Sequence, residues 1–383
     1  MPSAWIVGAA RSAIGRANKG SLVDLRPDDL ASIVVRAALA RVPALDPGMV
    51  EDVAFGCAQP AGEAGYNIAR AVALLAGLPG AGGTTVNRYC ASSLQAIRLA
   101  AHAILAGEGD VLVAGGVECV SRFGKGKADG MPDTRNARFG AGGLPDLYVA
   151  MGETAENVAD REHVTRQEMD GYAAGSQQRA VAAQERGFFA REIVPVSLPD
   201  GRVVDRDDGP RPGTTVEKLA TLGPAFRPDG RVTAGNACPL NDGAAAVVLM
   251  SEERARSMGI TPIARVVASA VSAVDPGIMG LGPIDATRRA LTRARLTMRD
   301  IDLVEMNEAF AAQVIPCARA LEIPREKLNV CGGAIALGHP FGMTGARLVV
   351  TLLNALEERG GRRGLATLCV GGGQGMALVV ERP

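Results

Sequence analysis

Two stretches of this chain repeat one order of predicted elements, and this repetition most constrains the fold. Each stretch contains a strand, a turn with a reactive side chain or glycines, a helix, and a strand that runs into glycines. The predicted elements are 53–55, the turn at Cys90, 93–106 and 111–114 in the first stretch, and 303–306, the turn at 332–333, 344–356 and 365–370 in the second. Alternating strands and helices form layers in which helices cover a sheet. We therefore expect an α/β protein with an internal duplication whose two copies face each other.

The segment 121–242 lies between the two copies and has a different character. It combines a polar helix-like run at 166–186 with a stretch rich in proline, glycine and aspartate at 205–213. Long excursions from a compact core tend to be functional covers, although a plain surface insertion is the alternative. We predict three domains: an N-terminal core domain of 1–120 plus about 243–268, an inserted loop domain of 121–242, and a C-terminal core domain of 269–383.

The composition argues against several classes of protein. The chain has 383 residues, enough for two or three domains, and its 41 basic and 41 acidic side chains balance. A net charge of zero gives no sign of a nucleic-acid or membrane-surface partner. No apolar run approaches the roughly 20 residues that span a bilayer, and seven cysteines without C-x-x-C spacing favour neither disulfides nor zinc. We predict a cytoplasmic protein with no membrane span, no metal site and no nucleic-acid partner.

Two of the cysteines stand where a thiol can react. Cys90 lies between a predicted strand and a predicted helix, and Cys369 lies where a strand runs into the glycines 371–373. Because the N-terminus of a helix stabilises an anion, we expect the pKa of the Cys90 thiol to be lowered. A free cysteine is more often a small buried hydrophobe. We assign that structural role to Cys57, Cys119 and Cys317.

One of the three histidines is placed to act as a base. His339 stands between Gly338 and Pro340, in backbone that cannot be a regular helix, so its imidazole can project into a cleft. His102 and His163 both fall in helix-like runs. Histidine is the usual base that activates a thiol. A histidine satisfied within its own loop is the ordinary alternative, but if the chain has a catalytic histidine, His339 is the best candidate.

Hydrogen-bond donors accompany these side chains. Asn307 follows a predicted strand and could hold a water or donate to an oxyanion, while the glycine loop after Cys369 could supply backbone N–H groups for a second oxyanion. The glycines could also suggest a dinucleotide-binding loop. Their place near the C-terminus, with no βαβ unit and no acidic residue about 20 positions on, argues against that. A nucleophilic thiol, a base and a second thiol are the parts of an acyl-transfer site that makes or breaks a carbon–carbon bond.

At four segments the chain resembles the thiolase family. They are 86–95 around Cys90, Asn307-Glu308-Ala309-Phe310, the glycine-rich segment that ends Gly338-His339-Pro340, and Cys369-Val370-Gly371-Gly372-Gly373. The resemblance extends over essentially the whole chain, and the motifs occur in the family's order. It implies a five-layered αβαβα fold of two similar core domains with an inserted loop domain, which matches the predicted duplication.

The resemblance also implies a role for each residue of the site. His339 would deprotonate Cys90, whose thiolate would attack a 3-oxoacyl-CoA and become acylated. Cys369 would protonate the departing acetyl-CoA carbanion or, in reverse, remove the α-proton of acetyl-CoA. His339 and a water held by Asn307 would form one oxyanion hole, and the N–H groups of Cys90 and Gly371 the other. Decarboxylating ketosynthases pair their cysteine with two histidines, so Cys369 at that second position favours the thiolase reaction.

Contacts to CoA follow from the same resemblance. Arg211 would pack on the adenine, and the pantetheine and acyl tunnel would be lined by Met151, Phe226, Ala234 and Met279. Cys238 stands where the family often has a serine that touches pantetheine. Ala150 stands where biosynthetic acetoacetyl-CoA thiolases often carry histidine, and it leaves space for a longer acyl chain.

The leading hypothesis is a degradative thiolase of fatty-acid β-oxidation, which cleaves 3-oxoacyl-CoA with CoA into acetyl-CoA and a shortened acyl-CoA. A biosynthetic acetyl-CoA acetyltransferase that forms acetoacetyl-CoA is the first alternative, and an inactive CoA- or lipid-binding relative is the second. We expect no permanently bound cofactor, because CoA and acyl-CoA are substrates. The family generally forms homodimers or homotetramers, and its tetramer contacts would lie in 123–139.

Overall fold

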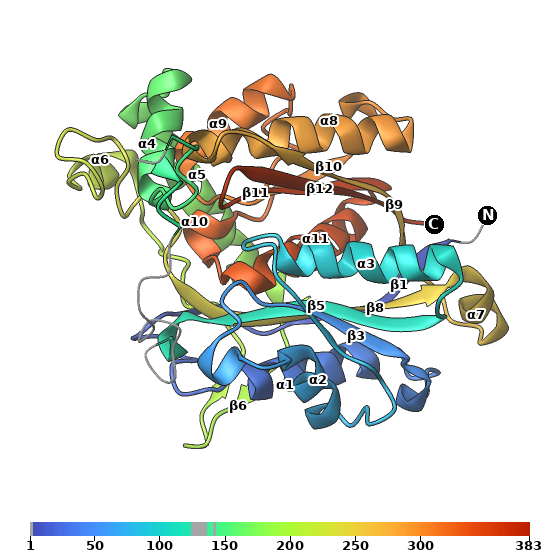
Figure 1. Ribbon diagram of the computed structural model, residues 1–383. Coiled ribbons are helices and arrows are strands. Elements are labelled where there is room, and N and C mark those ends of the chain that lie inside the picture. Colours follow the sequence, from blue (N-terminus) through green and yellow to red (C-terminus); the bar gives the residue numbers. More distant parts are fainter. Residues whose placement is uncertain (1–2, 124–135, 141–142) are drawn as a thin grey trace.

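Five layers of helices and strands make up the protein (Figure 1). The structure is a computed structural model, and it describes residues 3–123, 136–140 and 143–383. The outer helical layers are α1 (Pro27–Ala40) and α2 (Ile68–Leu75) on one side, and α8 (Gly282–Ala294) and α9 (Ala311–Ala320) on the other. The central layer contains α3 (Ser92–Ala106) and α11 (Phe341–Arg359). This arrangement confirms the predicted five-layered αβαβα fold.

The two strand layers are parts of one hydrogen-bonded sheet. Its order within the described residues is β10-β11-β12-β9-β1-β8-β5-β3-β4, and β2 (Gly15–Arg16) pairs with β8 beside this path. The strands are β1 (Ala4–Arg11), β3 (Asp52–Gly56), β4 (Thr84–Val86), β5 (Val111–Cys119), β8 (Asn241–Ser251), β9 (Ala264–Ala273), β10 (Leu303–Met306), β11 (Arg363–Val370) and β12 (Gln374–Glu381). β1 and β9 share only two residue pairs, so a short edge joins the two layers.

The predicted duplication is visible in the strand pairing. β3 and β5 pair in parallel and have α3 between them in sequence, while β10 and β11 pair in parallel and have α11 between them. A parallel pair needs a crossover connection, and each half therefore supplies one central helix. The two helices contact each other, and a Cβ on Gly345 of α11 would lie 2.4 Å from the backbone N of Leu94 in α3. The absence of a side chain at Gly345 thus permits the close approach of the two copies.

The chain between β5 and β8 forms a separate helical group. It contains α4 (Met151–Arg161), α5 (Arg166–Glu185), α6 (Val216–Ala220) and the short strands β6 (Val196–Ser197) and β7 (Val203–Val204). β5 and β8 pair with each other, so the chain leaves and re-enters the sheet at neighbouring strands. α4 and α5 pack on α9. The domain boundaries given above stay a prediction, and most of the segment 123–139 lies outside the described residues.

A buried ionic network attaches this inserted segment to the core. Arg11, at the end of β1, has no exposed surface, and its guanidinium donates to Glu192 at 2.6 Å and to the two carboxylate oxygens of Asp207 at 2.7 and 2.9 Å. Asp207 also accepts from the backbone N of Ile14 at 2.8 Å. Because buried charges are costly unless they are paired, the network holds the chain around Asp207 against the first core layer.

The structure corrects the prediction for one histidine and confirms the predictions for another histidine and for three cysteines. His163 is not helical: α4 ends at Arg161, and His163 follows in a turn with a left-handed φ of 52°. His102 does lie in a helix, α3. The three cysteines assigned a structural role, Cys57, Cys119 and Cys317, are all buried.

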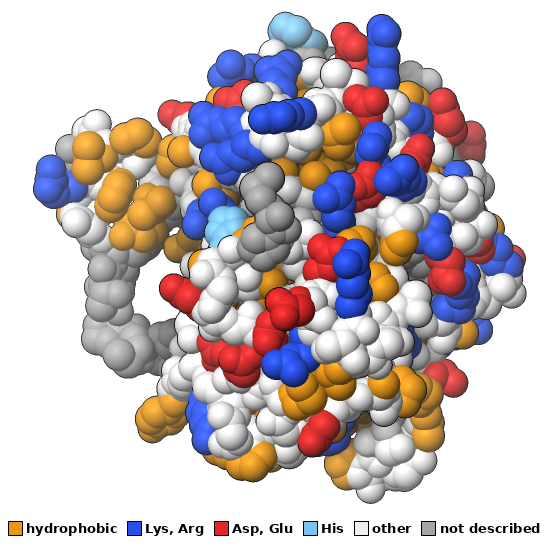
Figure 2. Space-filling model, turned by 90° about the vertical axis from the view of Figure 1, so that its right-hand side faces the viewer, with side chains coloured by type: hydrophobic (Ala, Val, Ile, Leu, Met, Phe, Trp, Pro, Cys, Tyr) orange, Lys and Arg blue, Asp and Glu red, His pale blue; other side chains and the backbone are white. Residues whose placement is uncertain are grey.

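The surface carries charges of both signs. Figure 2 shows them interspersed over one face, with lysine and arginine side chains gathered toward its upper part. In the outer layer, α8 exposes Arg288, Arg289 and Arg293. Within the described part of the chain, no helix is long and apolar enough to cross a bilayer, and no group of three or more His, Cys, Asp or Glu side chains could hold a metal ion.

Candidate active site

Cys90 lies in a tight turn between β4 and α3. Tyr89 has a left-handed backbone conformation with φ 44°, and the Ser92 hydroxyl closes the turn by accepting from the backbone N of Arg88 at 2.9 Å and donating to the carbonyl of Tyr89 at 2.6 Å. The thiol of Cys90 interacts with its own backbone N–H and with that of Gly371, in the turn between β11 and β12. The two halves of the duplicated fold therefore meet at this sulfur.

Burial controls the protonation of Cys90. It raises the pKa of the thiol to about 12, whereas the N–H groups of Gly371 and Cys90 act to lower it. The predicted lowering of the pKa is therefore wrong for the free protein. α3 begins only at Ser92, and its favourable field does not offset the loss of water around a thiolate. At rest Cys90 is therefore a thiol, and it would need a base to become a thiolate.

Hydrogen bonds fix both the backbone and the ring of His339. Its backbone N donates to Asn241 Oδ1 at 2.9 Å, and its Nδ1 lies 2.6 Å from Thr344 Oγ1. The Thr344 hydroxyl donates its single hydrogen to the carbonyl of Pro340 at 2.7 Å, so it can only accept from the imidazole. Nδ1 of His339 therefore carries the proton, and Nε2 presents a lone pair.

Nε2 of His339 faces Asn307. Asn307 Nδ2 lies 3.4 Å from Nε2, and Asn307 Oδ1 is buried without a hydrogen-bond partner among the described residues. Burial lowers the pKa of His339 to about 3, and the positive charge of Arg347 contributes in the same direction. The imidazole is therefore neutral at physiological pH, which is the form that a general base requires.

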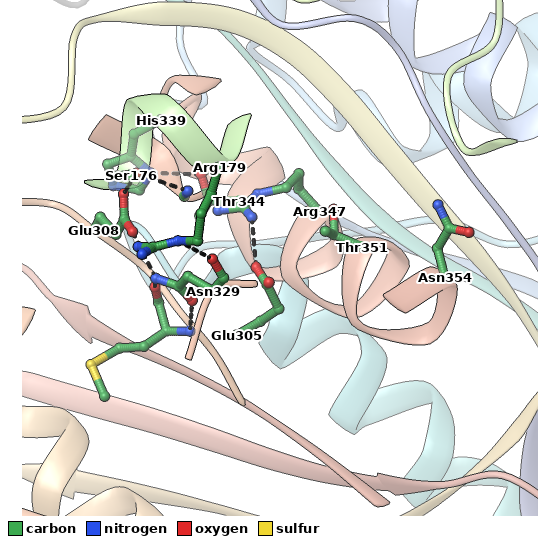
Figure 3. A network of polar contacts seen from close by, with 12 residues as sticks. Ser176, Arg179, Glu305, Glu308, Asn329, His339, Thr344, Arg347, Thr351 and Asn354 are labelled. Atoms are coloured by element: carbon green, nitrogen blue, oxygen red, sulfur yellow. Dashed lines mark hydrogen bonds and ion pairs between the residues drawn. The ribbon is translucent and has the colours of Figure 1, made fainter. Parts of the chain in front are cut away.

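Glu308, the residue after Asn307, organises this side of the site (Figure 3). It is fully buried. Its carboxylate accepts from four donors: Tyr172 Oη at 2.8 Å, Ser176 Oγ at 2.6 Å, Asn329 Nδ2 at 2.9 Å and the backbone N of Ile335 at 3.1 Å. These donors come from α5, from the loop after α9 and from the short helix α10 (Ala334–Leu337), which leads to His339. The carboxylate thus couples the positions of Asn307 and His339.

Two further thiols lie near Cys90. Charges on Cys369 or Cys238 would interact with a charge on Cys90. Cys369 is 1% exposed and belongs to an apolar cluster with Met279 and Phe310, and burial raises its pKa well above that of an ordinary thiol. The structure therefore brings together Cys90, Cys369 and the Gly371 turn, with both thiols protonated at rest.

Four of the predicted CoA contacts adjoin these groups. Met151 is partly exposed at the start of α4, and its sulfur lies 3.7 Å from the position of a Cβ on Gly371. Phe226 is 45% exposed and packs edge-on against Phe310, with 6.1 Å between ring centroids. The backbone N of Cys238 donates to the carbonyl of Ala309 at 3.0 Å, next to Phe310. Met279 is buried in the cluster that contains Cys369.

The other two predicted contacts, Arg211 and Ala234, are exposed. The backbone N of Arg211 donates to Gln177 Oε1 at 2.8 Å, and Gln177 Nε2 lies 3.5 Å from the carbonyl of Ile335. The segment that carries Arg211 is therefore attached to the short helix before His339. Within the described residues, no hydrogen bond links Ala234 to Cys90, His339 or Cys369.

The sequence analysis missed the residues that orient the reactive groups. Besides Thr344 and Asn241, which fix His339, Arg88 joins the Cys90 turn to the second half. Its Nη1 donates to Gln374 Oε1 at 2.8 Å, and its Nε donates to Gln95 Oε1 at 3.0 Å. Thr344 could have been noticed as a lone hydroxyl five residues after His339. The contact of Arg88 with Gln374 could not, because the two residues lie 286 positions apart in the sequence.

Comparison with known proteins identifies the family. The family model described as the N-terminal domain of thiolase matches residues 4–253, and that of the C-terminal domain matches residues 260–382. The chain belongs to the thiolase family. It is therefore an enzyme of the thiolase class.

Several relatives of this thiolase match it along their whole length. It is 48% identical to the β-ketoadipyl-CoA thiolase of Pseudomonas aeruginosa, over 99% of this chain and 98% of that protein. It is 46% identical to the 3-oxoadipyl-CoA/3-oxo-5,6-dehydrosuberyl-CoA thiolase of Escherichia coli, over 100% of both. Its structure matches that of the acetyl-CoA acetyltransferase of Bacillus anthracis with a TM-score of 0.91 and 42% identity, covering 100% of this chain and 99% of that one.

Proposed function

We propose that this thiolase cleaves 3-oxoacyl-CoA with CoA, releasing acetyl-CoA and an acyl-CoA that is two carbons shorter. The observation that carries the proposal is a pair of thiols, the partly buried Cys90 and the buried Cys369, which come from opposite halves of the fold and share one site with the N–H of Gly371. A protein that only binds CoA has no use for a second thiol beside the first. The inactive binding relative is therefore the weakest of the three hypotheses.

In the proposed first half-reaction, Nε2 of His339 takes the proton of Cys90 while the sulfur attacks the C3 carbonyl of the substrate. The C2–C3 bond then breaks, and the acyl group stays on Cys90. The electron pair of the broken bond goes to C2 of the departing acetyl-CoA, and C2 takes a proton from Cys369. Nε2, once protonated, becomes a hydrogen-bond donor beside Asn307 Nδ2, so both can stabilise a developing oxyanion.

In the proposed second half-reaction, CoA attacks the Cys90 thioester. Its thiol proton returns to Cys369, the thioester bond to Cys90 breaks, and Cys90 takes its proton back from His339. We expect the backbone N–H groups of Cys90 and Gly371, which interact with the sulfur of Cys90, to stabilise the thioester oxygen in both half-reactions. One such donor is commonly worth about 2.7–4 kcal/mol of activation free energy.

CoA is proposed as a substrate, with no permanently bound cofactor. The partly exposed Met151 and Phe226 border the Gly371 and Phe310 region, where a pantetheine arm would reach Cys90, and the exposed Arg211 could pack on the adenine. Cys238 and Ala234 are proposed as further contacts, and the buried Met279 as a contact of the acyl chain. A cytoplasmic location and a homodimer or homotetramer remain part of the proposal.

The acyl tail is proposed to be longer than that of acetoacetyl-CoA, as in β-oxidation. Ala150 lies directly before Met151 and provides only a methyl group at this edge of the site. Relatives named for 3-oxoadipyl-CoA support a longer tail and place a dicarboxylic substrate among the candidates. The likeness to the Bacillus anthracis acetyl-CoA acetyltransferase favours a second candidate function, acetoacetyl-CoA synthesis or cleavage.

The test is thiolysis of a series of 3-oxoacyl-CoAs from four to sixteen carbons together with 3-oxoadipyl-CoA, combined with mass spectrometry of Cys90. We expect an acyl adduct on Cys90 and a higher kcat/KM for tails longer than acetoacetyl. Equal or better turnover of acetoacetyl-CoA would instead support the second candidate. Absence of any Cys90 adduct and of turnover would contradict thiolase activity and leave a binding protein.

A further inference from the structure

Two buried carboxylates hold the ends of the segment that carries His339. Glu308 accepts from the backbone N of Ile335 near the start, and Glu118 Oε2 accepts from the backbone N of Gly342 at 2.8 Å at the end. Glu118 lies in β5, in the other half of the fold, and is 1% exposed. The proposed reaction described above gives Glu118 no part.

The surroundings of Glu118 suit a carboxylate. Its Oε2 also accepts from the backbone N of Ala58 at 2.8 Å, and its Oε1 accepts from the backbone N of Gln59 at 3.2 Å and from the thiol of Cys57 at 3.8 Å. Both oxygens thus face donors only. An ionised carboxylate is an acceptor at both oxygens, whereas an amide or a protonated carboxyl would direct a hydrogen toward an N–H group. The site is therefore built for the negative form.

Little space remains for Gly342 to shift. A Cβ on Gly342 would lie 2.4 Å from the carbonyl O of Val117 and 2.9 Å from Glu118 Oε2. Gly342 stands between His339 and Thr344, the pair whose 2.6 Å contact sets the tautomer of the imidazole. A movement of Gly342 therefore changes the position of the base.

We propose that Glu118 is a positioning residue of the thiolase reaction: its carboxylate fixes the start of α11 and, through it, the imidazole of His339. The proposal rests on the function proposed above. It adds a residue that touches neither substrate nor the reacting atoms, and it predicts that the proton on Glu118 controls the rate.

The pKa of Glu118 sets the pH range in which its proton is expected to affect the rate. Burial raises the pKa of the carboxyl to about 7, while the N–H groups of Ala58, Gly342 and Gln59 act to lower it. The titratable groups that face it are the thiols of Cys57, Cys119 and Cys90, whose pKa values burial raises, so they remain neutral. Glu118 is therefore fully ionised well above pH 7 and becomes protonated below it. We expect kcat to fall as the pH drops below 7.

The first experiment compares Glu118→Gln with Glu381→Gln. Glu381 is a buried carboxylate at the far end of β12, paired with arginines rather than with the site. For Glu118→Gln we expect kcat to fall roughly 10- to 100-fold with KM for CoA nearly unchanged, because the base is displaced while the binding surface stays. Glu381→Gln is expected to lower stability but to keep kcat. A folded Glu118→Gln enzyme with kcat within about twofold of the wild type would overturn the proposal.

The second experiment keeps Glu118 and changes its neighbour, which guards against a Glu118 variant that does not fold. Cys57→Ser replaces a weak donor to Oε1 by a stronger one and is expected to move the acid limb of kcat to lower pH by a few tenths of a unit. Cys57→Ala removes the donor and is expected to move the limb to higher pH. If the acid limb of kcat moves in neither variant, or moves in the same direction in both, Glu118 does not control the rate. An inactive wild-type enzyme would instead contradict the proposed function, so the two failures are distinguishable.

Discussion

Cys90 and His339 show opposite pKa shifts that have the same cause. The protein interior disfavours the thiolate of one and the imidazolium of the other, so both groups are neutral at rest. A pair that is neutral before reaction can exchange a proton only when substrate arrives to stabilise the new charges. The reactivity of Cys90 therefore depends on the bound substrate and on the fixed N–H donors rather than on a preformed thiolate.

A first prediction follows for alkylation of Cys90 by iodoacetamide in the absence of substrate. Because its raised pKa keeps the thiolate a minor species up to high pH, we expect the rate to rise about 100-fold between pH 8 and pH 10, whereas a thiol with an ordinary pKa of about 8.5 would gain only about fourfold. Mass spectrometry of the Cys90 peptide measures the rate. A rate that levels off near pH 8.5 would show that Cys90 is not desolvated in the free enzyme.

A second prediction concerns the tautomer of His339. Thr344→Val keeps the shape of the side chain but removes the acceptor of the Nδ1 proton, so we expect kcat to fall roughly 10- to 100-fold with little change in KM. Thr351→Val is the matched control, since Thr351 is buried in the same helix but donates to Glu192 at 3.1 Å, away from the imidazole. We expect the control to lose stability and keep kcat. Equal kcat values for the two variants would mean that Thr344 does not orient the base.

At the scale of elements, the contact between α3 and α11 brings the two halves of the site together. α3 follows Cys90, α11 follows His339, and at Gly345 and Leu94 the two backbones lie too close together to admit a Cβ. The periodic apolar sequences predicted both helices, although α11 begins at Phe341 rather than near 344. The added first turn matters, because it contains Gly342, which Glu118 holds.

A third prediction tests this helix contact. Gly345→Ala would place a methyl group against backbone atoms of α3, so we expect it to lower the free energy of unfolding by about 1–3 kcal/mol despite the better helix propensity of alanine. Gly171→Ala is the matched control in the interior of α5, where a Cβ would have no heavy atom within 4 Å. We expect that variant to be unchanged or more stable by about 0.5–1 kcal/mol. Urea unfolding measures both, and similar values would argue against close packing of α3 and α11.

At the scale of the whole molecule, the inserted segment depends on the core for its position. Arg11 reaches from β1 to Glu192 and Asp207, and the chain continues from Asp207 to the exposed Arg211. A buried arginine that faces two carboxylates leaves uncompensated charge if it is removed. This network therefore couples the stability of the fold to the place where CoA is proposed to bind.

A fourth prediction separates this network from ordinary surface ion pairs. We expect Arg11→Ala to lower the free energy of unfolding by about 3–5 kcal/mol and to raise KM for CoA more than it lowers kcat. Arg256→Ala removes an exposed arginine that pairs with Glu252, and we expect it to cost no more than about 0.5 kcal/mol. Denaturant unfolding and steady-state kinetics check both variants. An unchanged KM for CoA in a folded Arg11→Ala enzyme would show that the network serves stability alone.

By itself, the sequence determined the duplicated order of elements and the layered fold, and it predicted which residues react. These features depend on local patterns: apolar periodicity, glycine turns, and a few rare side chains placed beside them. Tertiary structure decided what no local pattern contains, namely that Cys90 and His339 are both neutral, that Thr344 sets the tautomer, and that Glu118 and Glu308 hold the two ends of the His339 segment. The physical reason is that desolvation and hydrogen-bond partnership arise between residues far apart in the chain, and they exist only once the two halves have packed together.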